Sequence, residues 1–331
     1  MHLRVAQTLV DDGELVRVPQ GAGFGLLIAP AEAIGGARAV ELLLAAVAAL
    51  GFVLAALLAR RIVPEPYASA GAALAGLSPP AIAHATAISP ELTAGTLLTG
   101  AALCAVSARE QPRPGAVLGG GAMLAALPWL GVLFAVAALP VAAALYVWCR
   151  RARRPLLGLL GAELIGASLV VYATVNERLY GGPTPWSASP PGETATGASG
   201  LVDYVERIPR LVTVWLDPEW GLLRWAPVFA LAFFGGWLLW RSRREHLARV
   251  VPARATAEAA AGLALAICAG QLLVAAFLVP AISGDWFAAR HLAPALPAAG
   301  ALVAWGLRHA PRLGTALGAV TLAASAWVLL D

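Results

Sequence analysis

Four residues near position 290 could bind an anion at the end of an apolar segment. The link PAISGDWFAARHL places Asp285, Trp286, Arg290 and His291 beside one another between two apolar runs. A guanidinium with a nearby imidazole suits a phosphate group, because it offers a charged fork of hydrogen-bond donors. The same residues also fit an aromatic membrane anchor whose arginine reaches the headgroups. Both interpretations stay open on sequence alone.

A second polar group lies in AIAHATAISPELTAG, where His84 and Glu91 flank a turn between two apolar stretches. Glu91 follows Pro90, so it occupies the first turn of a helix, where the helix dipole favours a carboxylate. It is therefore either a plain helix N-terminal charge or a general base or metal ligand facing a cavity. Glu163 and Gln271 fall deep within apolar runs, and we expect them to be hydrogen-bonding groups inside a helix bundle.

The elements that must position these residues are membrane helices. The chain has 331 residues, of which 60% are hydrophobic and 13% charged. Soluble domains are typically about 25% charged, so the composition predicts an all-α polytopic membrane protein. All of the basic residues are arginine, a coding bias of a GC-rich, actinobacterial-type genome, and they predict contact with anionic lipid headgroups and no nucleic-acid partner.

A helix needs about 20 apolar residues to cross a bilayer. On this criterion the chain forms a single transmembrane domain, 1–331, of about ten spans. The predicted spans are 37–60, 66–88, 91–109, 114–128, 129–149, 156–178, 221–240, 257–279, 292–308 and 313–330, with the fourth and fifth divided at Pro128.

Arginine runs predict which side each link occupies. CRRARR (149–154) and RSRRE (241–245) lie in short links on one side, which the positive-inside rule assigns to the cytoplasm. Residues 1–36 and 179–220 then lie on the extracytoplasmic side of a bacterial cytoplasmic membrane. The first segment reads as a short helix, a stop at Asp11-Asp12-Gly13 and a glycine-rich turn into a re-entrant or interfacial helix. The second reads as a Gly/Pro/Ser-rich loop followed by an interfacial helix with a charged face.

These segments in this order resemble a known family, the GT-C membrane glycosyltransferases that use polyprenyl-phosphate sugars, in particular mannosyl- and arabinosyltransferase-like members. The matching motifs are AQTLVDDGEL, GFGLLIAP, SPPAIAHATAISPELTAG, LPWLGVLFA, YGGPTP, LDPEWGLLRWAPV and SGDWFAARHLAPALP. The resemblance covers nearly the whole chain, with residues 1–36 matching part of the first extracytoplasmic loop. One departure is Gly131, which stands where the family pattern has a polar or basic residue.

The resemblance implies sugar transfer from a polyprenyl-phosphate donor to an extracytoplasmic glycan, lipid or protein acceptor. An acid deprotonates the acceptor hydroxyl, and arginine or a metal stabilises the departing phosphate. Glu91 is then an accessory catalytic acid with His84 nearby. Arg290, His291, Asp285 and Trp286 are then the residues that bind the lipid phosphate or the substrate. The sequence assigns no metal ligands, and a divalent cation stays a candidate cofactor beside the lipid-linked donor.

The family's leading acid belongs just before His2, where this sequence has only Met1, and Asp11 and Asp12 come too late to align with it. We therefore expect an N-terminally incomplete form, without the first membrane helix, or an inactive one. Two alternatives remain: a transporter or flippase of a lipid-linked saccharide, and a non-catalytic membrane assembly subunit. The oligomeric state is left open. A catalytic protein should bring Glu91, His84, Arg290 and the N-terminal segment to one cavity.

Overall fold

The computed structural model describes residues 2–11, 23–188, 196–198, 200–245, 252–281 and 289–330, and all regular structure within them is helical. Six helical segments in this part of the chain are long and apolar enough to cross a membrane. They contain α2 (Gly23–Ala59), α5 (Glu91–Glu110), α7 (Phe134–Arg151), α8 (Pro155–Tyr180) with η1 (Pro185–Ala188), α14 (Pro252–Leu273) with the π-helical turn η3 (Val274–Leu278), and α16 (Pro311–Leu330).

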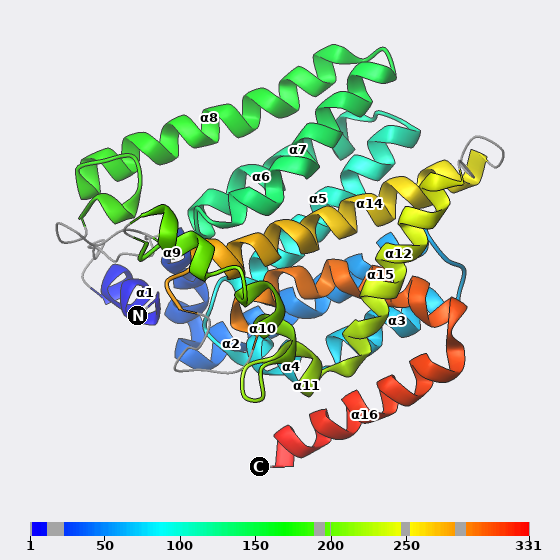
Figure 1. The fold of residues 1–331 in the computed structure, drawn as a ribbon. Coiled ribbons are helices and arrows are strands. Elements are labelled where there is room, and N and C mark those ends of the chain that lie inside the picture. The colour runs from blue at the N-terminus through cyan, green and yellow to red at the C-terminus, as the bar shows by residue number, and fades with distance from the viewer. Residues whose placement is uncertain are drawn as a thin grey trace.

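Shorter helices complete the structure. They are α1 (His2–Asp11), α3 (Tyr67–Gly76), α4 (Pro79–Thr86), α6 (Pro114–Leu130), α9 (Leu201–Glu206), α10 (Arg210–Leu216), α11 (Leu222–Trp225), η2 (Pro227–Phe229), α12 (Ala230–Arg244), η4 (Arg290–Ala295) and α15 (Leu296–His309). In Figure 1, α5, α14 and α15 lie in the middle of the bundle, while α8 and α16 form opposite edges.

The predicted spans differ from the structure in several places. Ten were predicted, whereas six helical segments of the described residues are long and apolar enough to cross a membrane, and the predicted span 221–240 is divided into α11, η2 and α12. The single span at 66–88 is divided into α3 and α4, because Ser78 is extended and Pro79 and Pro80 open a new helix. The division at Pro128 is also misplaced, since α6 continues through Pro128 to Leu130 and ends at Gly131. A proline in the last turn removes one helical hydrogen bond without ending the helix at that point.

The first segment is helical on both sides of residues 12–22, which lie outside the described residues. Helix α1 ends at Asp11 and packs on the beginning of α2, where Gln7 Nε2 donates to Glu32 Oε1 over 3.1 Å. Helix α2 is interrupted at Gly35 and Gly36, and Gly36 has a φ of 62°. The interruption separates an approach helix from the span that begins near residue 37; the predicted glycine-rich turn is wrong at Gly23 and Gly25, which belong to α2.

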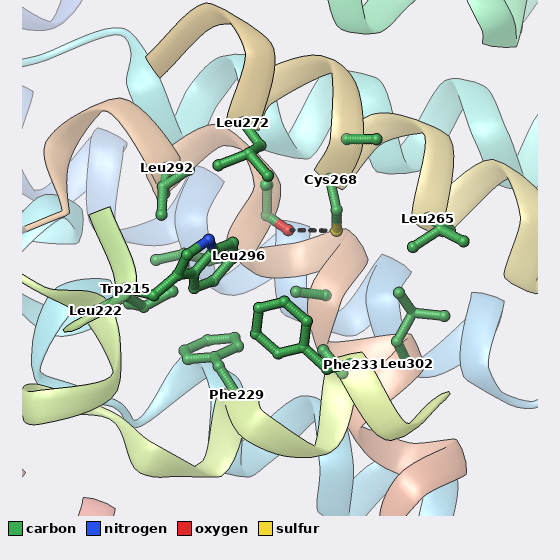
Figure 2. A pocket seen from close by; sticks show the side chains of 14 residues that line it. Trp215, Leu222, Phe229, Phe233, Leu265, Cys268, Leu272, Leu292, Leu296 and Leu302 are labelled. Carbon is green, nitrogen blue, oxygen red and sulfur yellow. Dashed lines mark hydrogen bonds between the residues drawn. The ribbon is translucent and has the colours of Figure 1, made fainter. Parts of the chain in front are cut away.

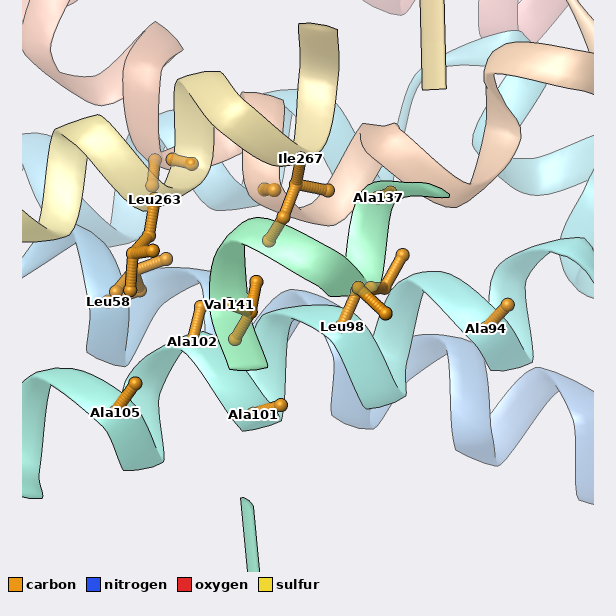
Figure 3. Packing of buried hydrophobic residues seen from close by; sticks show 14 of the residues in the cluster. Leu58, Ala94, Leu98, Ala101, Ala102, Ala105, Ala137, Val141, Leu263 and Ile267 are labelled. Carbon is orange, nitrogen blue, oxygen red and sulfur yellow. The ribbon is translucent and has the colours of Figure 1, made fainter. Parts of the chain in front are cut away.

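The packing core is built around α5. Small and branched residues recur on it at helical spacing and face α7, α14 and α2, as Figure 3 shows. The residues in contact include Ala94, Leu98, Ala101 and Ala105 of α5, Ala137 and Val141 of α7, and Leu263 and Ile267 of α14. Alanine at these positions lets helix backbones approach closely, the usual basis of helix association in membranes. The outer helices α8 and α16 are mostly exposed and form lipid-facing surfaces.

Glu163 departs from the expectation of an interior position. It lies on the exposed face of α8, so it is not a hydrogen-bonding group of the bundle interior. Hydropathy predicts only that a residue lies within a span, and the direction in which it points depends on which neighbouring helices cover α8.

The predicted interfacial helix is divided at Pro209 into α9 and α10, and its faces are oriented in an unexpected way. The residues Leu201, Val202, Val205, Ile208 and Val212 all point outward and are more than half exposed. The arginines Arg207 and Arg210 point inward instead. An outward apolar face is what a helix lying in the headgroup region of a bilayer presents to lipid.

Candidate functional site

A cavity of about 240 Å³ lies at the end of the bundle where α5 begins and α14 ends. We call this the site end. Backbone termini meet there because α6 ends, α7 begins and η4 leads into α15 at the same level. The lining residues are Pro90, Glu91, Leu130, Gly131, Val132, Leu133, Phe134, Tyr172, Pro185, Trp186, Gln271, Val274, Val279, Pro280, Ala281, Arg290 and His291.

An ion pair between Glu91 and Arg290 lies in this cavity. Arg290 Nε donates to Glu91 Oε1 over 2.7 Å, although the residues are 199 positions apart in the sequence. The Glu91 side chain is 9% exposed and the Arg290 side chain 46% exposed. A guanidinium has five N–H donors. Glu91 uses the donor on Nε, and the described residues make no hydrogen bond to the Arg290 terminal nitrogens, so these can bind an anion.

The other carboxylate oxygen of Glu91, Oε2, is buried. The Ser89 hydroxyl beside the carboxylate is a side-chain donor available to it within the described residues. Glu91 therefore has one oxygen committed to Arg290 and a second that can accept from a ligand hydroxyl.

Gly95 allows η4 to approach α5 closely enough for the ion pair to form. It lies one helical turn after Glu91, and a Cβ atom at this position would be 2.7 Å from the carbonyl oxygen of Pro294. Pro294 in turn follows Arg290 by four residues within η4. Because backbone cannot give way as a flexible side chain can, the pair depends on the absence of a side chain at residue 95.

His291 and Gln271 lie next to the ion pair. Gln271 Nε2 donates to the His291 carbonyl oxygen over 2.8 Å, which fixes the backbone of η4 against α14. Burial and the neighbouring Arg290 lower the pKa of the His291 imidazole, while Glu91 and the Ala281 carbonyl oppose this shift. His291 is therefore neutral at pH 7 and can serve as a hydrogen-bonding group in the cavity.

Aromatic side chains from two other segments close the cavity. Tyr172 of α8 packs edge-on against Trp129, with ring centroids 5.4 Å apart, and Trp129 Nε1 donates to Ser168 Oγ over 3.0 Å. Trp186 of η1 lines the cavity from the loop that follows α8. Gly131, the departure from the family pattern, lines the cavity without contributing a polar side chain.

A second cavity, of about 140 Å³, is almost entirely apolar (Figure 2). Trp215, Phe229 and Phe233 face Leu272, Leu292 and Leu296 across it. The polar atoms that Figure 2 shows are the Trp215 indole nitrogen, the Cys268 thiol and the Ala295 carbonyl oxygen, which lies 4.0 Å from the thiol. The two cavities meet at η4, because His291 lines the first and the next residue, Leu292, lines the second.

Two further arginines fix the wall of the first cavity. Arg207 donates to the carbonyl oxygens of Phe277 (2.7 Å) and Thr196 (2.8 Å), and Arg210 donates to those of Val279 (2.9 Å) and Pro280 (3.0 Å). The last carbonyls of a helix lack partners within the helix and favour nearby cations. We call this arrangement the carbonyl clamp; it caps the end of α14 and η3 from the side.

The structure brings together only part of the predicted site. Glu91, Arg290 and His291 line one cavity, whereas His84 is buried in α4, which packs against η4, and does not line that cavity. Asp285 and Trp286 lie outside the described residues. The sequence reasoning missed Trp186 and Tyr172, and it placed Gln271 in the bundle interior without assigning it to the site.

The described part of the cavity does not form a dedicated metal site. Among the described residues, no three His, Cys, Asp or Glu side chains are grouped to hold an ion. The cavity offers one carboxylate and one imidazole, whereas a catalytic zinc site uses three protein ligands. The divalent cation that the sequence left open stays a prediction, because Mg²⁺ binds through as few as one carboxylate together with water and a substrate phosphate.

Comparison with known proteins identifies the fold. No protein-family model and no curated protein matches the chain. The structure aligns with the crystal structure of ArnT from Cupriavidus metallidurans in the apo state, with a TM-score of 0.59 and 18% identity. The alignment covers 96% of this chain and 56% of that one, so the chain spans a little over half the length of ArnT. The predicted all-α, multi-pass fold is confirmed, and it is the fold of ArnT.

Proposed function

We propose that this protein transfers a sugar from a polyprenyl-phosphate donor to an acceptor at the site end of the bundle. The observation that carries the proposal is the Glu91–Arg290 pair inside a cavity bounded by aromatic residues. The fold shared with ArnT supports this class of chemistry. The acceptor is a glycan, lipid or protein of the cell envelope.

Arg290 would stabilise the leaving group. In the reaction the bond between the sugar anomeric carbon and the phosphate oxygen breaks, and the acceptor hydroxyl oxygen forms the new bond. The polyprenyl phosphate departs with an additional negative charge, which the terminal nitrogens of Arg290 can neutralise by charge-assisted hydrogen bonds. Glu91 holds the guanidinium in place through Oε1.

Glu91 Oε2 would accept a hydrogen bond from the acceptor hydroxyl and orient it. The family pattern gives the acceptor proton to an acid that precedes His2; in this proposal the proton passes to an oxygen of the departing polyprenyl phosphate. Glu91 is thus an acceptor-site residue in this proposal and does not replace that acid.

The apolar cavity suits the prenyl chain. It begins at Leu292, directly beside the phosphate-binding end of η4, and its lining is aliphatic and aromatic. Each buried CH₂ group contributes about 0.8 kcal/mol to membrane or pocket binding. A donor with its phosphate at Arg290 and its first prenyl units near Leu292 would therefore use both cavities.

The arginine distribution supports an extracytoplasmic site. The ends of the helices opposite the cavity carry Arg150 and Arg151 on α7, Arg241, Arg243 and Arg244 on α12, and Arg308 on α15. The positive-inside rule assigns that end to the cytoplasm. We therefore propose a bacterial cytoplasmic membrane protein whose catalytic end faces away from the cytoplasm.

The direct test is sugar transfer by purified protein in lipid nanodiscs. The donors are polyprenyl phosphates that carry labelled mannose or arabinose, and membrane extracts supply acceptors. We expect Glu91→Gln and Arg290→Gln each to lower the rate of transfer by about 100-fold or more, because Arg290 meets the developing phosphate charge and Glu91 orients both that guanidinium and the acceptor hydroxyl. Arg178→Gln is the matched control, since Arg178 is an exposed arginine in the last turn of α8.

The proposal would be wrong if wild-type protein moved no label from any of these donors. It would also be wrong if Arg290→Gln kept the wild-type rate, or if Arg178→Gln lost as much activity as Arg290→Gln. Retention of half the rate by Arg290→Lys would show that charge alone, without the planar fork, is sufficient.

A further inference from the structure

Gln271 is a buried amide in the wall of the Glu91–Arg290 cavity. It is 2% exposed and belongs to the last turn of α14, immediately before the π-helical turn η3. π-helical turns occur frequently at functional sites, because the extra residue changes the direction in which neighbouring side chains point. Val274 in that turn lines the same cavity.

The contact with η4 determines the orientation of the Gln271 amide, that is, which of its two terminal atoms is the nitrogen and which the oxygen. Nε2 donates to the His291 carbonyl oxygen over 2.8 Å, and a carbonyl cannot bond to the amide oxygen in its place. Oε1 is therefore the remaining end of the group. It is buried and accepts no hydrogen bond from the described residues.

An acceptor in this position is unfavourable unless a ligand uses it. Leaving a buried acceptor unsatisfied destabilises the folded protein, and most buried side-chain polar atoms in proteins have a partner. The link between α14 and η4 needs only the Nε2 donor. Oε1 contributes nothing to that link, and Gln271 is one of the residues that line the proposed reaction cavity.

The surroundings of Gln271 resemble what a sugar ring requires. Phe134, Tyr172 and Trp186 line the cavity from three separate segments, and polar groups are few and close to the ion pair. A pyranose or furanose has apolar C–H faces and a polar edge of hydroxyl donors. Aromatic walls with a small number of fixed acceptors match both parts, as in other small-molecule sites.

We propose that Gln271 recognises the donor sugar, its Oε1 accepting a hydrogen bond from one sugar hydroxyl and thereby contributing to the choice of sugar. This inference rests on the proposed function, since the ligand is the sugar of the polyprenyl-phosphate donor. Gln271 is a specificity residue in this role and does not touch the bond that breaks.

The test measures binding of six kinds of lipid to wild-type protein in nanodiscs. The probes are polyprenyl phosphate without sugar, polyprenyl-phosphate mannose and its 2-, 3-, 4- and 6-monodeoxy forms, with the arabinose series as a parallel set. We expect one monodeoxy form to bind roughly 10- to 100-fold more weakly than its parent, because it leaves the buried acceptor unpaired. Sugar-free polyprenyl phosphate reports phosphate and prenyl binding alone.

The variants are Gln271→Met and Gln111→Met. Gln271→Met should bind the parent sugar and the sensitive monodeoxy form equally weakly. It should lose less affinity for sugar-free polyprenyl phosphate, since that smaller loss reports only the missing Nε2 contact with η4. Gln111→Met is the matched control: it makes the same substitution at the opposite end of α5, where Gln111 Oε1 accepts a hydrogen bond from Arg113, and it should keep the full discrimination.

Each contrary outcome has a distinct meaning. If wild-type protein binds the donors but no monodeoxy form is weakened, or Gln271→Met still discriminates, Gln271 does not recognise the sugar. Equal loss of sugar-free polyprenyl phosphate by Gln271→Met assigns it a structural role instead and overturns the inference. If wild-type protein binds no polyprenyl phosphate of any kind, the proposed function itself fails, and this inference with it. If Gln271→Met does not fold, Gln271→Leu makes the same comparison, and a wild-type series without any sensitive form overturns the inference by itself.

Discussion

The ion pair and the carbonyl clamp use the same side chain in opposite ways. Arg290 meets a carboxylate with one N–H and leaves its terminal nitrogens in a cavity. Arg207 and Arg210 each spend both terminal nitrogens on backbone carbonyls and have no carboxylate within ion-pair distance in the described chain. One arrangement leaves donors for a ligand, and the other consumes them to hold a loop.

The difference shows which arginine is able to bind a substrate phosphate. A guanidinium already bound to two carbonyls at 2.7 and 2.8 Å must break those bonds before it can reach a phosphate. Arg290 needs no such rearrangement, because its Nε contact with Glu91 orients the guanidinium and does not involve the two terminal nitrogens. Both arrangements converge on one cavity, since the clamp fixes Val279 and Pro280, which line it.

The largest effect is expected from Gly95→Val, which breaks the ion pair without touching either charge. A β-branched side chain would collide with the Pro294 carbonyl, because even a Cβ atom would lie 2.7 Å from it. Overpacking of this kind typically costs about 1–3 kcal/mol. Displacement of η4 by about 1 Å should also lower transfer about 100-fold.

Activity and thermal unfolding in nanodiscs measure the two consequences separately. Gly115→Val is the control, since a Cβ atom there meets nothing within 4 Å. If Gly95→Val transferred sugar as fast as Gly115→Val, the ion pair would not be the arginine arrangement that supports transfer.

An intermediate effect is expected from Arg207→Leu, which removes the two hydrogen bonds of the more buried arginine of the clamp. Arg207 is 5% exposed, so the carbonyls of Phe277 and Thr196 would lose donors that water cannot easily replace. We expect unfolding to become easier by about 2 kcal/mol, within the range for unsatisfied buried groups. Arg210→Leu should cost less, because one of its two bonds is at the surface and water can replace it.

Thermal unfolding of both variants in nanodiscs checks the order, and donor titrations add a second readout. Because the clamp positions the cavity wall and does not touch the ligand, Arg207→Leu should raise KM for the donor more than it lowers kcat. Equal stability of the two variants, or a loss confined to kcat, would contradict this account of the clamp.

The sequence anticipated the pair but not the clamp, for a physical reason. Pro-Glu at a helix start and Arg-His at another are local signals, and the consistent sidedness of their spans indicated the same end of the bundle. The apolar spacing of residues 201–215 predicted a two-faced helix at the interface, but that spacing does not say which face meets protein. The tertiary positions of the Phe277, Val279 and Pro280 carbonyls turn the arginine face inward.

The same limit explains Gln271 and the divided span. Hydropathy places Gln271 inside a helix, and only the return of η4, twenty positions later, supplies the His291 carbonyl that orients its amide. In the stretch from 66 to 88 the apolar count is that of one span, whereas Pro79 and Pro80 determine the backbone and start α4.

The smallest expected effect concerns His291, whose pKa depends on the charges of Arg290 and Glu91. Its pKa is lowered in the folded protein by burial and by Arg290. Between that lowered pKa and about 6.5, the ordinary value, the unfolded chain binds a proton that the folded chain does not. Stability therefore falls as the pH falls through this window, by at most about 1.4 kcal/mol per pH unit, and is unaffected above it.

His291→Gln should remove this loss in thermal unfolding between pH 7.5 and 5, whereas His309→Gln, at the far end of α15, should leave it in place. The ion pair also predicts the direction of a second shift. Because Glu91 opposes the lowering of the His291 pKa, Glu91→Gln should move the lower limit of the window to still lower pH. Arg210→Gln should leave this lower limit at the same pH if the clamp and the ion pair are electrostatically separate. If Glu91→Gln and Arg210→Gln shifted the limit equally, both arginine arrangements would act electrostatically on His291.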